Sequence, residues 1–589
     1  MHIPEAYHVI ERLEAQLGDP NDREQVLSFK RAVELDERDE YPRDGCAVLD
    51  RAGINDYYIP VTDGGRLASF DVLAAIARTV GRRDLTVAIA HHKTFLAAVH
   101  VWVAGSTAQR QRTALYIRSG GRMALGYHEK EHGSDFQATE TVAQAIESGE
   151  YVLDGEKWFV NNATVGDVQT IFARTNERGG PRGFSLFLVD KRALDRDMYA
   201  HLPKLMTHGA RGVDFSGIRF TKARLAADCL IGSQGGGVEL TLRSFQITRA
   251  VVPAISLGAA DTALRAVLEF ALQRRLYGTT VFALARPRAT IVDAFVDLLA
   301  CDCVVIATAR ALHIVPEELR LWSAVTKFFV PATVGAMLDD LGEVLGARAY
   351  LREGYKFGIF QKIVRDHGAV PMFHAGGFLL LQTVGLSIPQ LNTFRRSASP
   401  EARDAILDVL DTIFAWRHPL PPFEPDRLVP YGRFRDLLFA VERLSEQLED
   451  GDVQTGLEPS VAGALAASFA ALRTAVTHQG RDLDEHRARF GPSSSDKPEF
   501  FAICERYCVL HAAVVCAYTW ARNRQDMDPA FGGGHWLVLC LQRLLQRVGI
   551  HQPVPDGIRD HVAELLVRLH RESRSFSVIP WRLAEPTSS

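Results

Sequence analysis

The periodicity of apolar residues changes twice along the chain, and this constrains the fold more than any other feature. Between about residues 124 and 220, short runs of alternating apolar and polar residues are separated by Gly, Pro, Asn and Asp-Gly turns. Such runs are typical of antiparallel strands, and several in succession predict a small barrel. Before residue 120 and after residue 236, apolar residues recur three and four positions apart, which predicts helices. A β-barrel between two helical regions is therefore expected.

One part of the strand region combines groups that suit a flat ligand. A polar loop at residues 128–135 contains the pair Gly133-Ser134, and the strand one hairpin later carries Phe159 followed by Asn161-Asn162. An aromatic ring can lie against a planar cofactor while amides and backbone N–H groups bind its heteroatoms. These residues predict a site for a flat, anionic cofactor. An ordinary β-hairpin with a polar loop is the alternative.

Composition limits the classes of function. A chain of 589 residues with 47% hydrophobic residues can bury large cores, and its length predicts three or four domain-sized units. The net charge of -4 favours neither nucleic acid nor an anionic membrane. No apolar run reaches about 18 residues without a charge or a breaker, and no targeting segment is recognisable, so a cytoplasmic protein without a membrane span is expected.

Cysteine and histidine usage argues against a metal centre. The eight cysteines lie mostly in apolar helical sequence and never form a CxxC pair near a histidine cluster, which predicts reduced core thiols. His91, His92 and His100 share no ligand spacing with a carboxylate or cysteine. They are expected to be structural or to line a substrate cavity.

Several motifs carry a family resemblance. Residues 126–135 resemble the T-E-P-x-x-G-S-D flavin loop of the acyl-CoA dehydrogenase and acyl-CoA oxidase superfamily, and residues 155–162 resemble its G-x-K-x-(W/F)-I-(T/G)-N strand. His128, Lys130 and Asn161 stand where that superfamily usually has Thr, Pro and Thr. Residues 58–65 and 105–109 before them, and further segments after them, also resemble superfamily motifs in the same order, so the resemblance covers about residues 55–390.

The resemblance implies an α+β multidomain fold and a cofactor, FAD. The expected units are an N-terminal helical domain (1–120), a β-barrel (121–235), a helical bundle (236–395) and an appended C-terminal helical domain (396–589). One long helix, kinked by Pro253, is expected at the start of the bundle. By analogy, the appended domain covers the surface through which shorter members form tetramers, which leaves a homodimer.

The flavin contacts are carried over residue by residue. Residues 273–278 resemble E-R-x-x-F-G, whose Arg reaches the flavin pyrophosphate of a neighbouring subunit; a solvated basic helix end is the alternative. Residues 343–350 replace the Q-x-x-G-G-x-G-(F/Y) loop, with Ala347 and Ala349 in place of glycines. Ser134 and Arg249 are expected to contact substrate. The full cofactor set is Tyr127, His128, Gly133, Ser134, Phe159, Asn161, Arg274, Tyr277, Glu343, Gly346 and Gly376.

The residue that defines the reaction departs from the family. After Arg365-Asp366 the family carries a catalytic Glu, which removes the α-proton of an acyl thioester while the β-hydride passes to flavin N5. This chain has His374 there, and Thr248 at the alternative position of the base. A desolvated histidine is neutral at pH 7 and can accept a proton. The imidazolium formed would attract the anionic enolate.

The sequence therefore predicts FAD-dependent α,β-dehydrogenation of an acyl thioester, bound to CoA or to an acyl-carrier protein, with His374 as the base. Electron-transfer flavoprotein or oxygen would reoxidise the flavin. Two alternatives stay open. One is a reduced-flavin monooxygenase on the same fold, and the other is a catalytically silent partner subunit in which His374 only fills the space of the missing Glu.

Overall fold

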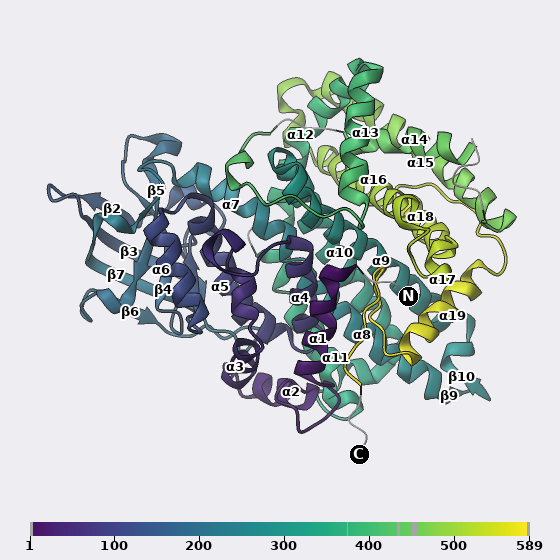
Figure 1. Cartoon of the computed structure of the whole chain (residues 1–589), viewed down its shortest axis with the longest axis horizontal. Coiled ribbons are helices and arrows are strands. Elements are labelled where there is room, and N and C mark those ends of the chain that lie inside the picture. The colour runs from purple at the N-terminus through teal and green to yellow at the C-terminus, as the bar shows by residue number, and fades with distance from the viewer. Residues whose placement is uncertain (1–3, 374, 433–435, 450–455, 586–589) are drawn as a thin grey trace.

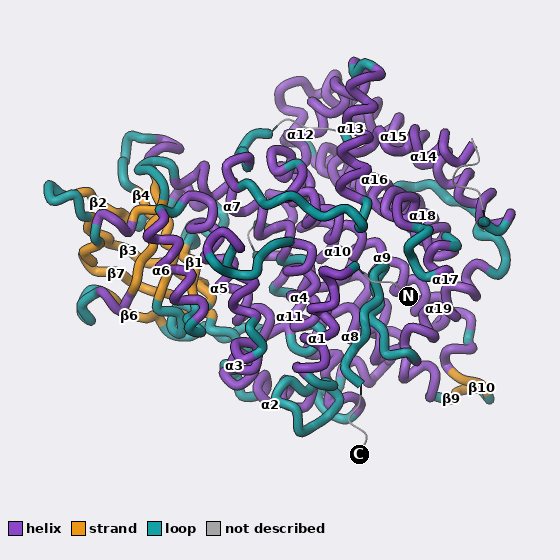
Figure 2. The backbone as a smooth tube through the Cα atoms, viewed as in Figure 1, coloured by secondary structure: helices purple, strands orange, loops and turns teal. Residues whose placement is uncertain are grey.

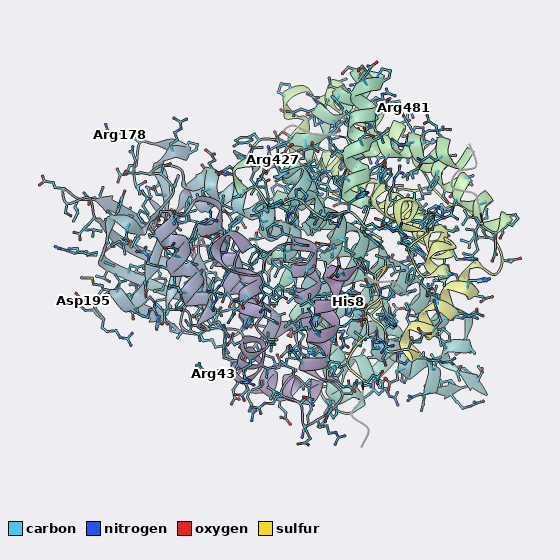
Figure 3. The ribbon with its side chains drawn as sticks, viewed as in Figure 1. His8, Arg43, Arg178, Asp195, Arg427 and Arg481 are labelled. Carbon is cyan, nitrogen blue, oxygen red and sulfur yellow. The ribbon has the colours of Figure 1, made fainter. Side chains whose placement is uncertain are left out.

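The computed structural model describes residues 4–373, 375–432, 436–449 and 456–585. The strands gather at one end of the long axis, and helices fill the rest of the molecule (Figures 1 and 2). Charged side chains point outward from both parts, as Arg178 and Asp195 do on the sheet end (Figure 3). The changes of periodicity in the sequence thus correspond to this division into a strand end and a helical body.

Six α-helices precede the sheet in the described residues. They are α1 (His8–Leu17), α2 (Phe29–Glu37), α3 (Arg43–Arg51), α4 (Phe70–Gly81), α5 (Leu85–Ala104) and α6 (Thr107–Arg118). The α5 helix is buried almost all round because it packs against α4, α7 and β1. It starts where the Asp84 side chain accepts a hydrogen bond from the Thr86 N–H at 2.9 Å, and it ends before Gly105.

Eight strands form one sheet in the order β6-β7-β3-β2-β4-β5-β8, with β1 parallel to β4. The sheet bends around its own apolar core, in which the Tyr151 and Phe187 rings lie 4.9 Å apart. A strand core closed by side chains from facing strands is what the barrel prediction requires. The strands are β1 (Met123–Gly126), β2 (Val142–Ala145), β3 (Tyr151–Asn161), β4 (Val168–Arg174), β5 (Phe184–Asp190), β6 (Tyr199–Leu202), β7 (Phe215–Leu225) and β8 (Leu230–Ile231).

The bundle that follows differs from expectation in one respect. Instead of one kinked helix, α7 (Gly237–Val251) and α8 (Ala254–Gln273) are separate helices, because Pro253 lacks the N–H that would continue the ladder. A short hairpin, β9 (Arg275–Leu276) and β10 (Thr279–Thr280), follows α8. The remaining helices are α9 (Ala285–Ile314), α10 (Leu319–Leu345), α11 (Ile359–His367) and α12 (Gly377–Ser397).

The C-terminal region packs onto the bundle. Its helices are α13 (Pro400–Phe414), α14 (Ala440–Glu449), α15 (Pro459–Phe490), α16 (Pro498–Asn523), α17 (Pro529–Gly532), α18 (His535–Arg547) and α19 (Ile558–Arg571). Both α16 and α18 contact α9. The segment at residues 576–577 lies against α4 and α9. The Phe576 carbonyl accepts a hydrogen bond from Arg78 of α4 at 2.7 Å, and Ser577 donates one to Asp302 of α9 at 2.6 Å. The region is therefore joined to the bundle and to the first domain.

Five helical stretches among the described residues are long and apolar enough to cross a membrane, judged by length and composition. These stretches can contain up to two charged residues, whereas the sequence expectation concerned runs without a charge or a breaker; the absence of a membrane span stays a prediction. In four stretches between 78% and 94% of the apolar window is buried inside the protein, whereas the stretch Pro459–Asp496 has 39% buried. All eight cysteines are free and seven are buried, as predicted.

Candidate active site

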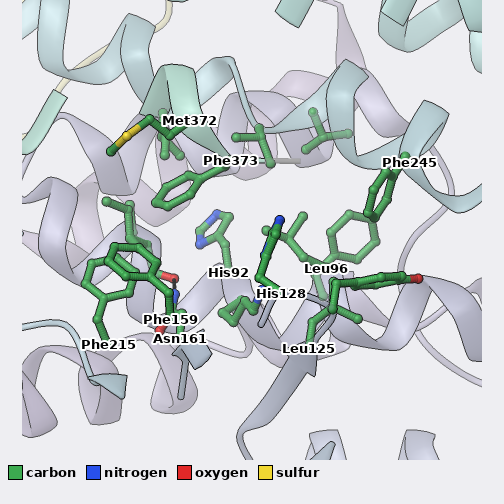
Figure 4. Close-up of a pocket in the computed structure, with 18 of the residues that line it drawn as sticks. His92, Leu96, Leu125, His128, Phe159, Asn161, Phe215, Phe245, Met372 and Phe373 are labelled. Carbon is green, nitrogen blue, oxygen red and sulfur yellow. Dashed lines mark hydrogen bonds between the residues drawn. The ribbon is translucent and has the colours of Figure 1, made fainter. Parts of the chain in front are cut away.

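A cavity of about 360 Å³ lies between the sheet and the bundle. One face of α5 forms a wall, α7 and the start of α8 form a second, and β3 with the loop after β1 forms a third. Met372 and Phe373 face His92 and His128 across the space (Figure 4). This volume falls in the range of small-molecule sites, and the lining is mainly apolar with a few polar groups.

Six residues of the expected cofactor set line this cavity: Tyr127, His128, Gly133, Ser134, Phe159 and Asn161. The Tyr127 hydroxyl is hydrogen-bonded to His100 Nε2 at 2.8 Å and to Thr241 Oγ1 at 2.9 Å, so it shapes the wall. Gly133 and Ser134 are exposed at the mouth. Folding thus assembles the loop and strand motifs around one space.

A bulge in β3 aims two successive side chains at the cavity. The register of β3 with β7 shifts between Trp158 and Val160, and Phe159 has a positive φ of 56°. In a regular strand, neighbours point to opposite faces, whereas here Trp158 and Phe159 both line the cavity. The Phe159 ring stacks on Phe215 at 5.0 Å and an interplanar angle of 21°, which presents a flat aromatic face.

Unpaired polar groups at this face fit a flavin ring. The Asn161 amide nitrogen donates to the Ile89 carbonyl at 3.1 Å, but its Oδ1 is buried without a hydrogen-bond partner. Gly133, at a φ of 52°, has open space within 4 Å of the position a Cβ would occupy. A ring with N–H and carbonyl groups along its edge would satisfy such an acceptor and approach such a backbone. The unpaired acceptor of Asn161 and the open backbone at Gly133 therefore fit the isoalloxazine part of FAD.

A buried ion pair holds the loop that follows β1. Lys157 on β3 is fully buried, and its Nζ donates to Glu129 Oε1 at 2.7 Å and to the Tyr127 carbonyl at 3.3 Å. Glu129 also accepts from the backbone N–H of Glu140 at 2.7 Å. Burial opposes ionisation of Glu129, but the Lys157 charge and these hydrogen bonds lower its pKa to about 2. The pair therefore fixes the loop carrying His128 to the strand carrying Phe159.

Lys93 is a cavity residue that no sequence motif identified. It lines the cavity from α5 and is half-buried, and burial lowers the pKa of its ammonium to about 8. Partial desolvation and the charges of Lys93 and Lys157 likewise lower the pKa of His128. Helical spacing could have suggested Lys93, since it lies one turn after Ile89 on the lining face of α5.

The rest of the cofactor set lies elsewhere. Arg274, Tyr277, Glu343 and Gly346 are exposed at the ends of α8 and α10, and we call them the far surface. Figure 1 places the β9–β10 hairpin at the opposite end of the long axis from the sheet. Arg348 joins the two helix ends by lying over the Phe270 ring at 5.3 Å. Within one chain these residues do not reach the cavity.

The two positions for a base lack a carboxylate, as the sequence indicated. Thr248 is buried, and its hydroxyl donates to the Phe245 carbonyl at 3.3 Å. His374 lies outside the described residues. Its neighbours Met372 and Phe373 line the cavity. The segment before them is held by Lys327, whose Nζ donates to the Val370 carbonyl at 2.7 Å.

Two further predicted residues lie near this segment. Arg249 packs its guanidinium over the Phe245 ring at 5.4 Å, and burial with the nearby Arg320 charge lowers its pKa to about 10. Gly376 is the residue that precedes α12. Neither belongs to the cavity lining described above. Their roles in substrate and cofactor binding stay predictions.

Comparison with known families agrees with this geometry. Residues 124–223 match the model of the acyl-CoA dehydrogenase middle domain, and residues 235–374 match that of the acyl-CoA dehydrogenase C-terminal domain. The first segment contains the loop and strand of the cavity, and the second contains the far surface.

The part of the chain that these two models match belongs to the acyl-CoA dehydrogenase superfamily.

Curated relatives cover the same part of the chain. A probable acyl-CoA dehydrogenase of Mycobacterium leprae is 25% identical over 320 residues, which are 54% of this chain and 81% of the relative. A cyclohex-1-ene-1-carbonyl-CoA dehydrogenase of Geobacter metallireducens is 27% identical over 345 residues, which are 57% of this chain and 87% of the relative. The similarity to these relatives thus covers little more than half of this chain.

Solved structures extend the likeness in fold. Butyryl-CoA dehydrogenase of Megasphaera elsdenii has a TM-score of 0.59 and 18% identity, covering 66% of this chain and 99% of its own. An acyl-CoA dehydrogenase of Bacillus anthracis, solved with FAD, has a TM-score of 0.72 and 16% identity, covering 96% of this chain and 95% of its own. The fold of the appended helical region is therefore shared with a member of the superfamily, as predicted.

One other group of potential ligands lies outside the cavity. Glu458, His535 and His561, at the starts of α15, α18 and α19, place one ligand atom each within 4.8 Å of one another. His535 Nε2 lies 3.6 Å from Glu458 Oε2, and the rings of His535 and His561 stack with their centroids 4.3 Å apart. The expectation that the chain holds no metal stays a prediction.

Proposed function

We propose that the chain binds FAD in the cavity and catalyses the α,β-dehydrogenation of an acyl thioester. The observation that carries this proposal is the convergence of the flavin-loop and strand residues of the superfamily on one mostly apolar cavity. FAD, when bound, accepts the electrons removed from the CH–CH bond. Relatives of this chain are named as dehydrogenases of CoA thioesters, and a similar structure is titled as a complex with FAD.

The residues of the cavity would bind the flavin ring. Phe159 offers its ring face, Asn161 its amide, and the Gly133-Ser134 backbone its N–H groups. Arg274 would bind the pyrophosphate, as a planar donor suits phosphate oxygens. Because Arg274 lies at the opposite end of the molecule from the sheet, it would reach the cofactor of a second copy. A homodimer is therefore part of the proposal, and the exposed Tyr277 would lie at its interface.

The proton would be removed by His374. This follows from its position after Arg365-Asp366 and from the absence of a carboxylate at Thr248. Its neighbours Met372 and Phe373 face the cavity, and Lys327 holds the turn that leads to them. The neutral imidazole would take the α-proton, and the charge it gains would stabilise the developing enolate. Arg249 and Ser134 would contact the substrate.

The proposal includes two thioester carriers and two electron acceptors. The acyl group would be carried by CoA or by an acyl-carrier protein. Electron-transfer flavoprotein or oxygen would accept electrons from the reduced enzyme. Two structures similar in fold, at TM-scores of 0.58, are titled as an electron-transferring flavoprotein study and as a prolyl acyl-carrier-protein oxidase. Both choices belong to the same reaction at the CH–CH bond.

We propose that the protein acts in the cytoplasm.

The test is anaerobic bleaching of the purified yellow protein by acyl thioesters. The rate should rise with pH as an imidazole loses its proton, near pH ~6.5 in the unperturbed case. His374→Ala should lose about 10²-fold or more of this rate while it keeps its flavin. The matched control is His478→Ala, which removes an exposed helical histidine of the C-terminal region and should leave the rate unchanged.

Each contrary result would indicate a different function for this protein. Equal bleaching by His374→Ala and the wild type would exclude His374 as the base. A wild type that does not bleach, but takes electrons from a nicotinamide and consumes oxygen, would be a monooxygenase. A flavin-loaded protein that is inactive in both assays would be a silent partner subunit.

A further inference from the structure

A chain of hydrogen bonds runs from a carboxylate to the wall of the cavity. His91 Nε2 lies 3.1 Å from Asp50 Oδ1, and His91 Nδ1 lies 2.6 Å from the Tyr58 hydroxyl. The same hydroxyl lies 3.2 Å from His92 Nδ1. Tyr58, His91 and His92 are buried, so these groups have little access to water. This series of hydrogen bonds starts at Asp50, outside the cavity, and ends at His92, which lines it.

The Asp50 carboxylate determines the direction of every hydrogen bond in this series. Burial opposes ionisation of Asp50, but hydrogen bonds from His91 and Arg122 outweigh it and lower the pKa of the carboxyl. An ionised carboxylate accepts, so His91 carries its proton on Nε2 and accepts at Nδ1. The Tyr58 hydroxyl donates its single proton to His91 and accepts from His92 Nδ1–H. The opposite order would place two acceptors, Asp50 and His91 Nε2, against each other.

His92 Nε2 is consequently a neutral acceptor without a partner. No hydrogen-bond partner of this atom exists in the described part of the chain. Burial lowers the pKa of His92 to about 3, so the imidazole stays neutral at physiological pH. Its neighbours on the lining face of α5 include the apolar Ile89, Phe95 and Leu96 and the charged Lys93, which does not hydrogen-bond this atom within the described residues. Figure 4 shows the His92 ring directed into the cavity below Phe373.

We propose that His92 forms a specificity subsite that accepts a hydrogen bond from a hydroxyl or amide N–H of the acyl group. This inference rests on the proposed function, because it assumes that an acyl thioester enters the cavity. A buried acceptor left unpaired is costly, and a ligand that donates to it removes this cost. A site built to bind a substrate O–H discriminates strongly against the analogue that lacks it. Tyr58 is the positioning residue, since it holds the tautomer of His92.

The experiment uses the FAD-loaded protein and pairs of probes. The probes are ω-hydroxyacyl-CoA thioesters of increasing length, each paired with the alkyl thioester that carries a methyl group in place of the hydroxyl. Binding is measured by calorimetry with the corresponding 2-enoyl thioesters, which are products and are not oxidised further. At one length the hydroxylated ligand should bind about tenfold or more tightly than its methyl partner. kcat/KM for the saturated thioesters should show the same preference.

Variants locate the preference. His92→Leu replaces the acceptor by an apolar side chain and should abolish the preference for the hydroxylated ligand. The main reason is that the affinity for the methyl partner should rise relative to that for the hydroxylated ligand. Tyr58→Phe should reduce the preference because the tautomer is no longer held. In proteins with ¹⁵N-labelled histidine, the signal of an unprotonated Nε2, assigned by its loss in His92→Leu, should weaken in Tyr58→Phe. His511→Leu, in the buried interior of α16, is the matched control and should keep the preference.

Other outcomes overturn the inference. Equal affinity for both partners at every length, with normal oxidation of the alkyl thioesters, would exclude the subsite and leave the proposed function standing. If neither kind of thioester binds, the proposed function fails instead. Loss of FAD from His92→Leu, with an unchanged preference in the loaded fraction, would assign the acceptor to the cofactor. An unchanged preference in His92→Leu that retains FAD would assign it to another residue.

Discussion

The cavity and the far surface carry two parts of one predicted cofactor site, yet they are built in different ways. At the cavity, Lys157 and Glu129 form a buried ion pair, and Tyr127 and Asn161 are hydrogen-bonded to other elements. At the far surface, Tyr277 is 93% exposed, and the Arg274 side chain forms no hydrogen bond within the described residues. Residues that are organised by their own chain differ in this way from residues that, under the proposed function, act on the cofactor of a second copy.

Acid should cause the largest loss of folding stability, through the buried histidines around the cavity. Burial lowers the pKa of His91 and His100 to about 4 and that of His92 to about 3. Unfolding restores a pKa near ~6.5, so the unfolded chain binds these protons first, and stability is lost as pH falls from ~6.5 toward ~4. In this window each histidine lowers the free energy of unfolding by about 1.4 kcal/mol for every unit by which the pH falls. Melting temperatures across this window provide the measurement.

The control for acid lability is a second histidine variant. His92→Leu should flatten the dependence of melting temperature on pH, whereas His478→Leu, an exposed position, should not. A melting temperature that stays constant from ~pH 6.5 to ~pH 4 would contradict the burial of neutral histidines around the cavity.

Removing one partner of the buried pair should have the next largest effect. Lys157→Met leaves Glu129 buried without its counter-charge, and we expect a loss of about 3–5 kcal/mol in the free energy of unfolding. Urea denaturation of the apoprotein measures it. Arg192→Met, which breaks an exposed pair with Asp190, should cost about 1 kcal/mol or less. Equal losses in both variants would show that the pair does not organise the cavity.

Removing Arg274 should change cofactor binding but not folding. Arg274→Ala should weaken FAD retention by about 1.5–3 kcal/mol, the value of a charge-assisted hydrogen bond. The apoprotein should unfold at the same urea concentration as the wild type. Arg275→Ala makes the same change of charge at the neighbouring exposed residue and should retain FAD. Unchanged flavin content in dialysed Arg274→Ala would remove the far surface from the cofactor site.

Mixing two defective chains should restore part of the binding. Phe159→Ala loses a ring contact of about 0.5–1.5 kcal/mol, and Arg274→Ala loses the phosphate contact. If each site uses one cavity and the far surface of the other copy, a heterodimer contains one intact site. A statistical mixture should then hold about one quarter of its sites with wild-type affinity. Fluorescence titration with FAD measures that fraction, and its absence would place both residues in one chain.

Particular residues show how far the sequence could lead. The Gly133-Ser134 loop and the Phe159 strand were assigned to one cofactor site, and the fold brings them to one cavity. The bulge at Phe159 was not foreseen, because a register shift depends on the partner strand β7. Pro253 was expected to kink a helix and instead separates two, since a missing hydrogen bond signals a break but not its extent.

The sequence by itself determined the local order of helices and strands and the type of chemistry, because periodicity and motif residues are properties of short segments. Only the tertiary structure decided which of two adjacent histidines faces the cavity. His91 and His92 are the same residue type and are adjacent on one helix. Asp50 and Tyr58, from other elements, hydrogen-bond both ring nitrogens of His91, whereas Nε2 of His92 is unpaired. Such a difference arises from long-range contacts, which no local pattern contains.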